Sequence, residues 1–272
     1  MITSSHNPKI QAVRALLARR KDRHEQSAFV VEGVRLAEEA FQAGWTPQQV
    51  LVSQQLSERG RSLVSAFSER RIEIEEISPS LLSSLADTEA PQGLLAVFHT
   101  RQLPLPEELD FVLVVDSVRD PGNLGTILRS ASAAGVQGVL LSPGTVDAFA
   151  PKVLRAGMGA QFHLPLVMMD WDEIQRLSRK PDRPLRLLLA EAGQGASIWQ
   201  TDLCQPLALI VGGEAEGASQ DARKMADGLI TVPMPGPSES LNAAVAASII
   251  LFDVVRQRSQ RSQRSDPNQR DK

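Results

Sequence analysis

The stretch FVLVVDSVRDPGNLGTILRSASAAG, residues 111–135, decides the fold class of the larger part of this chain. Its first five residues are uninterrupted apolar sequence and the sixth is a carboxylate, which is typical of a central parallel strand buried on both faces. The segment TILRSASAA (126–134) predicts a helix directly after that strand. A strand followed by a helix is the repeating unit of a parallel α/β sheet.

The same alternation continues to about residue 257. Strands are predicted at 136–142, 164–168, 185–190, 207–213 and 229–234. Helices are predicted between them at 171–179 and 219–227, and a long, mostly apolar helix from about 239 to 257. Strands separated by helices imply right-handed crossovers, so this part is predicted to be a parallel-sheet α/β domain.

A smaller α/β unit is predicted before this domain. Its strands are expected at 28–33, 48–53, 71–77 and 93–98, and its helices at 34–44, 57–70 and 79–87. The segment RQLPLPEELD (101–110) has neither periodicity and is the best linker candidate. We therefore expect domains at 1–105 and 106–257, and a disordered basic tail at 258–272.

Composition excludes several classes of protein. The longest apolar runs last about five residues, whereas a membrane-spanning helix needs roughly 20. The N-terminus MITSSHNPKI has no apolar core and is not a secretory signal. Cys204 is the single cysteine, and the histidines have no paired metal-ligand spacing. The chain is expected to be cytoplasmic, with no membrane association and no metal.

Positive charge is concentrated near the N-terminus although the net charge is −3. Local clusters of basic residues in a mildly acidic protein are typical of a protein that binds phosphates with part of its surface. The candidate phosphate contacts are Lys9, Arg14, Arg19 and Arg20. A solvated helix face explains the same cluster equally well. Few aromatic residues, 4% and no tyrosine, argue against a base-stacking platform.

Polar and glycine residues follow three predicted strands, where ligands collect in open parallel sheets. In 116–135, Pro121 and Gly122 are expected to set a turn, and Asn123 to cap a helix or hold a ligand. Gly125 allows close backbone approach, and Arg129 one helical turn later suits a phosphate. Taken alone, this stretch favours a capped helix with an exposed arginine over a ligand site.

The other two strand ends are also weak signals alone. In LALIVGGEAEGAS (207–219) the glycines do not have the spacing of a dinucleotide or P-loop motif, and a tight turn explains them. In LITVPMPGPSESLNAAVAASIILFDVVRQ (229–257) three prolines stiffen the loop. Ser238 or Ser240 is expected to cap the following helix, with Leu241 and Asn242 in its first turn.

Together the three segments resemble the signature of the TrmH (SpoU) branch of SPOUT RNA methyltransferases. The matching residues are Asn123, Gly125, Arg129, Ala131 and Gly135; then Gly212, Glu214 and Gly217; then Pro233, Met234, Gly236, Ser240, Leu241 and Asn242. Ala243-Ala244 departs from the valine and serine common there. The stretches ITSSHNPKI, FVVEGVRLAEEA and DTEAPQGLLAVF resemble the ribosomal-protein-like RNA-binding domain that precedes this domain in many relatives.

The resemblance implies a C-terminal trefoil knot, S-adenosylmethionine as cofactor, a homodimer and methylation of a ribose 2′-hydroxyl. Residues implied to bind the cofactor are Gly212, Gly213, Val232, Pro233, Met234 and Leu241. Arg129 is the residue implied to act on the hydroxyl, with the RNA phosphate as our hypothesis for the proton acceptor. The residues implied to position Arg129, the nucleotide and the loops are Asn123, Glu214, Ser240 and Asn242.

Other functions stay open at this point. Large-subunit ribosomal RNA is the expected substrate, with transfer RNA as the alternative and a resistance-type ribosomal methylation also possible. A protein that only docks on ribosomal RNA is a further reading, although docking does not need Asn123, Arg129, Glu214 and Asn242. A nicotinamide-dependent oxidoreductase fits poorly, because its glycine fingerprint is missing after the first strand of either half.

Overall fold

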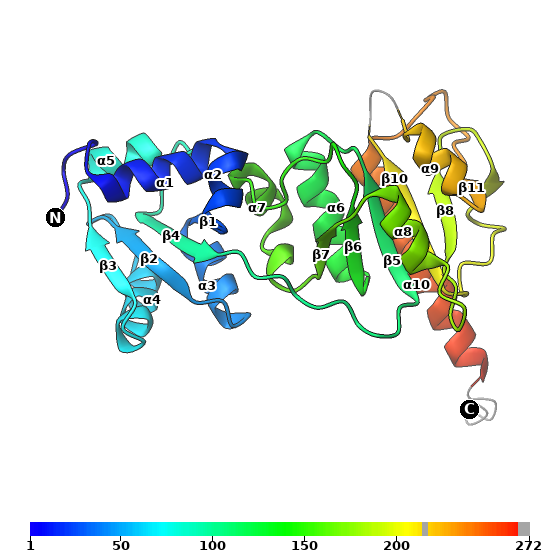
Figure 1. The fold of residues 1–272 in the computed structure, drawn as a ribbon, viewed down its shortest axis with the longest axis horizontal. Helices are drawn as coiled ribbons and strands as arrows, with labels where there is room; N and C mark the ends of the chain where they lie inside the picture. The colour runs from blue at the N-terminus through cyan, green and yellow to red at the C-terminus, as the bar shows by residue number, and fades with distance from the viewer. Residues whose placement is uncertain (214–216, 266–272) are drawn as a thin grey trace. The chain divides into compact units, whose positions relative to one another are not determined.

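The chain forms two compact units that do not follow the expected domain boundary. The computed structural model describes residues 1–213 and 217–265. One unit comprises Met1–Arg101 together with Asp147–His163, and the other comprises Gln102–Val146 and the chain from Leu164 onward (Figure 1). The expected 1–105 domain therefore lacks a segment that is more than 40 residues away in the sequence.

The first unit is built on a mixed four-stranded sheet in the order β1-β4-β2-β3. Its strands are β1 (Ala28–Glu32), β2 (Pro47–Val52), β3 (Glu73–Glu76) and β4 (Leu94–His99). β4 is antiparallel to both neighbours, and β2 is parallel to β3. Helices α1 (Pro8–Ala18) and α5 (Pro79–Leu85) pack on one face, while α3 (Val34–Gln42) and α4 (Glu58–Glu69) pack on the other. The short α2 (Arg20–Glu25) follows α1.

The segment Asp147–His163 completes the core of this unit. It contains α7 (Pro151–Gly157) and the short helix η1 (Ala160–Phe162), and its side chains Phe149, Leu154 and Phe162 pack with Phe29 and Trp45. The Trp45 indole Nε1 donates to the carbonyl oxygen of Phe162 over 3.0 Å. Nothing in the local periodicity of this segment shows that its apolar side chains belong to a distant sheet.

The second unit is a seven-stranded sheet in the order β7-β6-β5-β10-β8-β11-β9. Its strands are β5 (Phe111–Asp116), β6 (Gly138–Leu141), β7 (Leu166–Met168), β8 (Arg186–Ala190), β9 (Ala196–Ser197), β10 (Leu207–Gly212) and β11 (Gly228–Thr231). Every pair of neighbouring strands is parallel. The predicted parallel α/β class is confirmed, while the knot stays a prediction.

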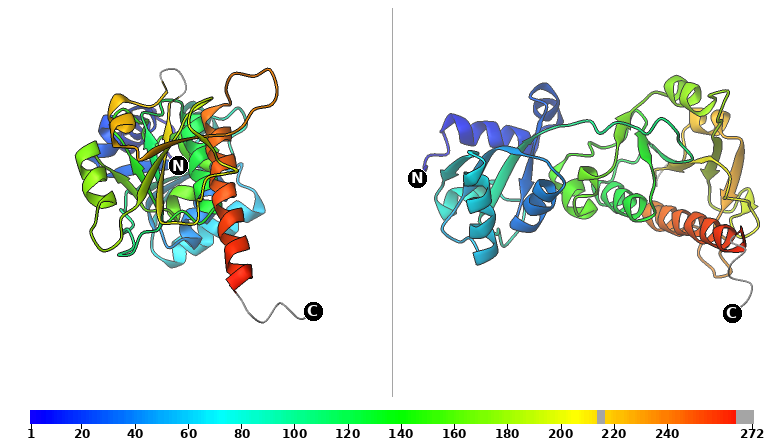
Figure 2. Two further views of the ribbon diagram at one scale, coloured as in Figure 1. Left: turned by 90° about the vertical axis from the view of Figure 1, so that its right-hand side faces the viewer. Right: turned by 90° about the horizontal axis from the view of Figure 1, so that it is seen from below.

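Helices cover both faces of this sheet (Figure 2). α8 (Trp171–Ser178) and α9 (Gln220–Met225) pack on the face that carries Val112 and Ile210. α6 (Pro121–Ala133) and α10 (Ala243–Ser265) lie side by side, joined by a 2.7 Å hydrogen bond between the hydroxyls of Ser130 and Ser248. All carboxyl ends of the strands therefore meet at one edge between the two helix layers.

Two helices begin at other positions than expected. α6 begins at Pro121, because Asp120 accepts from the Asn123 amide over 2.7 Å and proline fits the first helical position. Pro121 and Gly122 are therefore helical and do not form a separate turn. α10 begins at Ala243, and Asn242 is its cap: Oδ1 of Asn242 accepts from the amides of Ala244 (3.0 Å) and Val245 (3.2 Å). The expected caps Ser238 and Ser240, and the helical placement of Leu241 and Asn242, are wrong.

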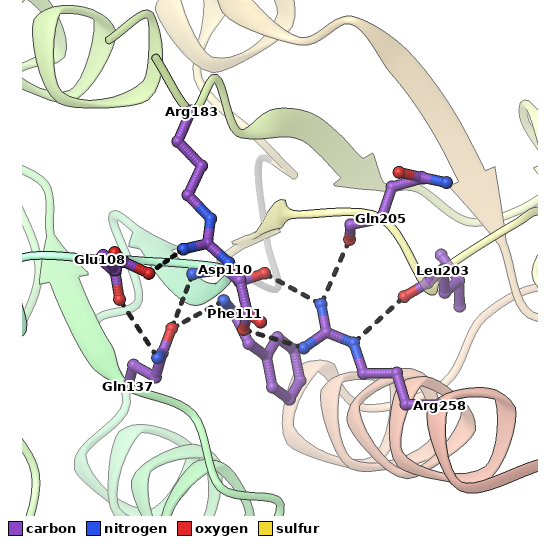
Figure 3. A network of polar contacts seen from close by, with 8 residues as sticks. All are labelled: Glu108, Asp110, Phe111, Gln137, Arg183, Leu203, Gln205 and Arg258. Atoms are coloured by element: carbon purple, nitrogen blue, oxygen red, sulfur yellow. Dashed lines mark hydrogen bonds and ion pairs between the residues drawn. The ribbon is translucent and has the colours of Figure 1, made fainter. Parts of the chain in front are cut away.

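The basic stretch after residue 257 is helical through Ser265, so the expected disordered tail is wrong for 258–265, while 266–272 lie outside the described residues. Arg258 anchors this part of α10 (Figure 3): its guanidinium donates to Oδ1 (3.0 Å) and the backbone oxygen (2.9 Å) of Asp110, and to the oxygen of Gln205 (3.2 Å). It also lies 4.9 Å from the ring centroid of Phe111. Of the helices that the structure describes, none is both long and apolar enough to cross a membrane.

Candidate active site

A cavity of about 370 Å³ lies at the carboxyl edge of the parallel sheet. The ends of β8, β10 and β11 form its walls together with the segment before α10 and the first turns of that helix. Seven of the residues expected at the site line this cavity: Gly212, Gly213, Val232, Met234, Ser240, Leu241 and Asn242. Pro233 lies between two of them in the chain but does not line the cavity, and Glu214 lies outside the described residues.

Gly212 and Gly213 allow backbone to pack directly on backbone beside the cavity. A Cβ atom on Gly212 would lie 2.6 Å from the amide nitrogen of Ala218, and one on Gly213 would lie 2.9 Å from the backbone oxygen of Ser117. Real side chains do not approach backbone so closely, so both positions require glycine. Ser117 itself has φ of 55°, an uncommon conformation for a residue with a side chain.

Asn123 and Asn242 meet although they come from different signature segments. The side-chain nitrogen of Asn242 donates to Oδ1 of Asn123 over 2.9 Å. Asn123 lies in the first turn of α6 and Asn242 caps α10, so the bond ties the starts of the two helices together. Asp120 and not Asn123 caps α6, so the expected capping role of Asn123 is wrong.

Arg129 lies on α6 with an exposed side chain. It does not line the cavity. Among the residues that the structure describes, no hydrogen bond or ion pair engages its guanidinium. A guanidinium held on a rigid helix without such a partner suits bidentate binding of a phosphate.

Sequence reasoning missed Glu191, the one charged residue among those that line the cavity within the described chain. It follows β8, and both of its carboxylate oxygens bond the guanidinium of Arg223 on α9, one of them over 2.5 Å. The rule that ligands collect at carboxyl ends of strands applies equally to β8. Ala190, Ala192, Thr231, Ala246 and Ile250 also line the cavity and were not expected.

The four basic residues expected to contact RNA differ in their surroundings. The Lys9 ammonium bonds Glu73 over 2.7 Å and also bonds Glu75, and these hydrogen bonds raise the pKa of Lys9 above its ordinary value. Within the described part of the chain Arg14 makes one long bond, to Ser84 over 3.4 Å, and the residues Arg14, Arg19 and Arg20 are exposed. Lys9 is therefore already engaged within its own unit, which counts against it as a phosphate contact.

Within residues 1–213 and 217–265 no group of three or more histidine, cysteine, aspartate or glutamate side chains is placed to hold a metal ion.

A parallel α/β domain with a glycine-walled cavity at the carboxyl edge of its sheet defines a cofactor-binding α/β protein. The chain belongs to the SpoU rRNA Methylase family, which residues 110–252 match. Residues 7–96 match the MRM3-like substrate binding domain.

Two curated relatives align over almost the whole chain. The 23S rRNA (uridine(2479)-2'-O)-methyltransferase of Streptomyces viridochromogenes is 34% identical over 94% of this chain and 92% of its own length. The 23S rRNA (guanosine(2553)-2'-O)-methyltransferase RlmP of Bacillus subtilis is 33% identical over 92% of this chain and 97% of its own length.

Solved structures agree with this assignment. The SpoU methyltransferase AviRb from Streptomyces viridochromogenes, in complex with the cofactor AdoMet, is 32% identical and superposes with a TM-score of 0.84, covering 93% of this chain and 99% of that one. The AdoMet-bound rRNA methyltransferase from Sinorhizobium meliloti is 29% identical with a TM-score of 0.83, over 94% of this chain and 97% of that one.

Proposed function

We propose that this protein transfers a methyl group from S-adenosylmethionine to a ribose 2′-hydroxyl of large-subunit ribosomal RNA. The observation that carries the proposal is that the second and third signature segments meet at one cavity and are joined to the first segment by the bond between Asn242 and Asn123. The relatives named above act on 23S rRNA, and two structural neighbours hold the proposed cofactor.

The cavity fits the proposed cofactor in size and chemistry. Its volume of about 370 Å³ lies in the range of small-molecule sites. Gly212, Gly213, Val232, Met234 and Leu241 offer backbone donors and acceptors and mostly apolar side chains, as an adenosine requires. When bound, S-adenosylmethionine supplies an electrophilic methyl group on a sulfonium. Pro233 would stiffen the segment between Val232 and Met234.

Arg129 would contact the RNA and not the cofactor. A free hydroxyl is a weak nucleophile and must be oriented and lose its proton. An arginine is a poor base, because its pKa lies above about 12. We assign it instead to a phosphate of the RNA, which it would hold where the phosphate accepts the proton or lowers the pKa of the hydroxyl. The Asn123–Asn242 bond would fix α6, and with it Arg129, relative to the cavity. Ser240 and Glu214 stay proposed positioning residues.

The first unit would bind the RNA substrate. Residues 7–96 match a substrate binding domain, and the exposed guanidinium groups of Arg14, Arg19 and Arg20 provide positive charge on that unit. A ribosomal RNA substrate makes the cytoplasm the proposed place of action.

A second copy of the chain would cover the outer face of α10. Val245 and Phe252 are 46% and 49% exposed, and with half-buried Ile249 they form a stripe at helical spacing. An exposed apolar stripe on a helix that also lines the cavity suits a homodimer contact. Light scattering should give the mass of a dimer, and Phe252→Glu should shift it to that of a monomer. A wild-type monomer at working concentration would refute the dimer.

The substrate class is tested by offering the purified protein labelled S-adenosylmethionine with ribosomal RNA or transfer RNA from a strain that lacks the gene. We expect label in large-subunit ribosomal RNA only. Gly212→Val should abolish labelling, since any Cβ there would lie 2.6 Å from the amide of Ala218. Label in transfer RNA alone would replace the proposed substrate, and no label in either RNA, although both cofactor and RNA bind, would favour a docking protein.

A further inference from the structure

Asp116, the last residue of β5, is a fully buried carboxylate that neither lines the cavity nor belongs to the matched signature residues. Burying a charge is unfavourable unless the group is well hydrogen-bonded. Asp116 meets this requirement with two bonds: Oδ1 accepts from the hydroxyl of Ser142 over 2.8 Å, and Oδ2 accepts from the backbone amide of Ser219 over 2.6 Å. The second bond reaches a segment 103 residues further along the chain.

The two bonds join three separate parts of the sheet edge. Asp116 ends β5, Ser142 follows β6, and Ser219 caps α9 through its own hydroxyl, which accepts from Ala222 over 3.1 Å. The Ser142 hydroxyl oxygen also accepts from the amide of Ser117 over 3.1 Å. Asp116 is thus the group that holds the start of α9 to the end of β5.

The residues just before Ser219 form a wall of the cavity. Gly217 and Ala218 line it beside Gly212 and Gly213 at the end of β10. Gly217 bridges to Gly213, and Gly212 packs so closely on Ala218 that a Cβ atom would be only 2.6 Å from the Ala218 nitrogen. A displacement of Ser219 would therefore move Ala218 and reshape this wall directly.

We propose that Asp116 is a positioning residue of the cofactor pocket, which holds Gly217 and Ala218 in place through the Ser219 amide. This inference rests on the proposed function, because it concerns the binding of S-adenosylmethionine to the same cavity. If the carboxylate were purely structural, its removal would lower the stability of the protein without changing the affinity of the folded molecules for S-adenosylmethionine. If the carboxylate positions the pocket, its removal changes both the stability and this affinity.

Three variants separate these two roles by calorimetric titration with S-adenosylmethionine and by thermal unfolding. Asp116→Ala removes the acceptor for Ser219 and should raise the Kd of the folded protein about tenfold or more, since small misplacements of binding groups have such effects. Asp116→Asn should keep Kd within about threefold of wild type, because its amide oxygen accepts from Ser219 while its NH₂ donates to Ser142. Ser142→Ala, the matched control, should lower the unfolding temperature but leave Kd unchanged, because the bond to Ser219 remains.

A second pair of variants decides the matter if Asp116→Ala does not fold. Ser219 has φ of −62°, which proline adopts. Ser219→Pro therefore removes the donor of the bond to Asp116 without a conflict in φ, and its ring carbon, which replaces the amide hydrogen, pushes residue 219 away from the Asp116 carboxylate. Ser219→Ala removes only the capping hydroxyl and keeps that amide. We expect Ser219→Pro to raise Kd about tenfold above that of Ser219→Ala.

Steady-state kinetics gives an independent reading. The KM for S-adenosylmethionine should rise in Asp116→Ala and Ser219→Pro, while kcat at saturating cofactor stays near that of wild type. The inference would be overturned if Asp116→Ala had the Kd of wild type, or if Ser219→Pro had the Kd of Ser219→Ala. It would also be overturned if Kd rose equally in Ser142→Ala and Asp116→Ala. A wild-type protein that binds no S-adenosylmethionine would instead refute the proposed function on which the inference depends.

Discussion

The side-chain nitrogen of Asn242 donates to Oδ1 of Asn123 over 2.9 Å, across 119 positions of the sequence. The same Asn242 side chain accepts from the first amides of α10 through its oxygen. One amide group therefore caps the helix that lines the cavity and fixes that helix to α6, which carries Arg129. Together with the bond between the hydroxyls of Ser130 and Ser248, this bond links the cofactor cavity to the helix of the residue assigned to the RNA.

Replacing the two asparagines separately distinguishes the cap from the link. Asn242→Ala should lower the free energy of unfolding by about 1 kcal/mol, the usual effect of losing a helix cap, and should also lower methyl transfer. Asn123→Ala should lower methyl transfer with a smaller effect on stability, because the cap stays in place. Thermal unfolding and methyl incorporation measure the two effects. Full activity in Asn123→Ala would show that the link has no role in the reaction.

Arg129→Ala should lower kcat by roughly a hundredfold or more, the scale found when one electrostatic contact to a transition state is removed. The Kd for S-adenosylmethionine should stay near that of wild type, because Arg129 does not line the cavity. Single-turnover kinetics and calorimetry give the two values. Arg129→Lys is the control: it keeps the charge but loses the bidentate geometry, so it should recover only part of the rate. A loss of cofactor binding in Arg129→Ala would contradict the assignment.

RNA affinity should depend on the exposed arginines of the first unit and not on Lys9. The double change of Arg14 and Arg19 to alanine should weaken RNA binding and reduce the dependence of log K on log salt by up to about 0.9 for each lost phosphate contact in a duplex. Lys9→Ala should bind RNA like wild type, since Glu73 and Glu75 already engage the Lys9 ammonium. Filter binding over a range of salt measures both. An equal loss in Lys9→Ala would contradict this division.

The first unit should not fold from residues 1–101 alone. Those residues lack Phe149, Leu154 and Phe162, which pack with Phe29 and Trp45. They also lack Asp147, whose carboxylate bonds Arg23 over 2.6 Å with both side chains at most 10% exposed. Circular dichroism of the 1–101 fragment should show no cooperative unfolding transition, and a cooperative transition would refute the prediction.

The Arg23–Asp147 pair offers a finer test in the whole chain. Asp147→Ala should lower the free energy of unfolding by about 3–5 kcal/mol, because it leaves the buried guanidinium of Arg23 unpaired. The double change of Arg23 and Asp147 to alanine should lower it by less than the sum of the single changes. Denaturant unfolding measures all three. Additive losses would show that the two groups do not interact.

Stability should fall in acid partly through Asp227. Burial alone would raise the pKa of Asp227, but the hydrogen bonds from Arg179 (2.6 and 3.1 Å) and the Leu187 amide (2.8 Å) more than offset this and hold the pKa below 3.8. A lowered pKa adds stability that is present above the unfolded value and is lost as pH falls through the folded value. The stability difference between wild type and Asp227→Asn should be constant above about pH 5 and should shrink below about pH 4. A difference that does not change with pH would contradict this.

The parallel sheet and the cavity edge could be predicted because their signals are local. β5 was expected at 111–116 and is found there, since a strand buried on both faces is an unbroken apolar run. The rule that ligands collect at the carboxyl ends of strands indicated the segments 207–219 and 229–257. The resemblance to the SpoU family then implied Gly212, Gly213 and Asn242, which line the cavity. The same rule applied to β8 would have found Glu191.

The features that were missed depend on distant partners. Asp147–His163 has the composition of an ordinary helical connection, and only packing on β1 and α3 places it in the first unit. The stretch after residue 257 is basic and low in apolar residues, which is typical of a tail, but Arg258 bonds Asp110, 148 positions away. Asn242 was not distinguished from Ser238 and Ser240 as a cap because all three residue types suit that position.

Nucleoside mass spectrometry shows whether the methyl group goes to a ribose. Ribosomal RNA that lacks the modification is incubated with the protein and S-adenosylmethionine, digested to nucleosides, and each methylated nucleoside is fragmented between base and sugar. We expect one nucleoside with the added mass on the ribose fragment, and none with Arg129→Ala. Added mass on a base fragment, or an undiminished ribose signal in the variant, would contradict this expectation.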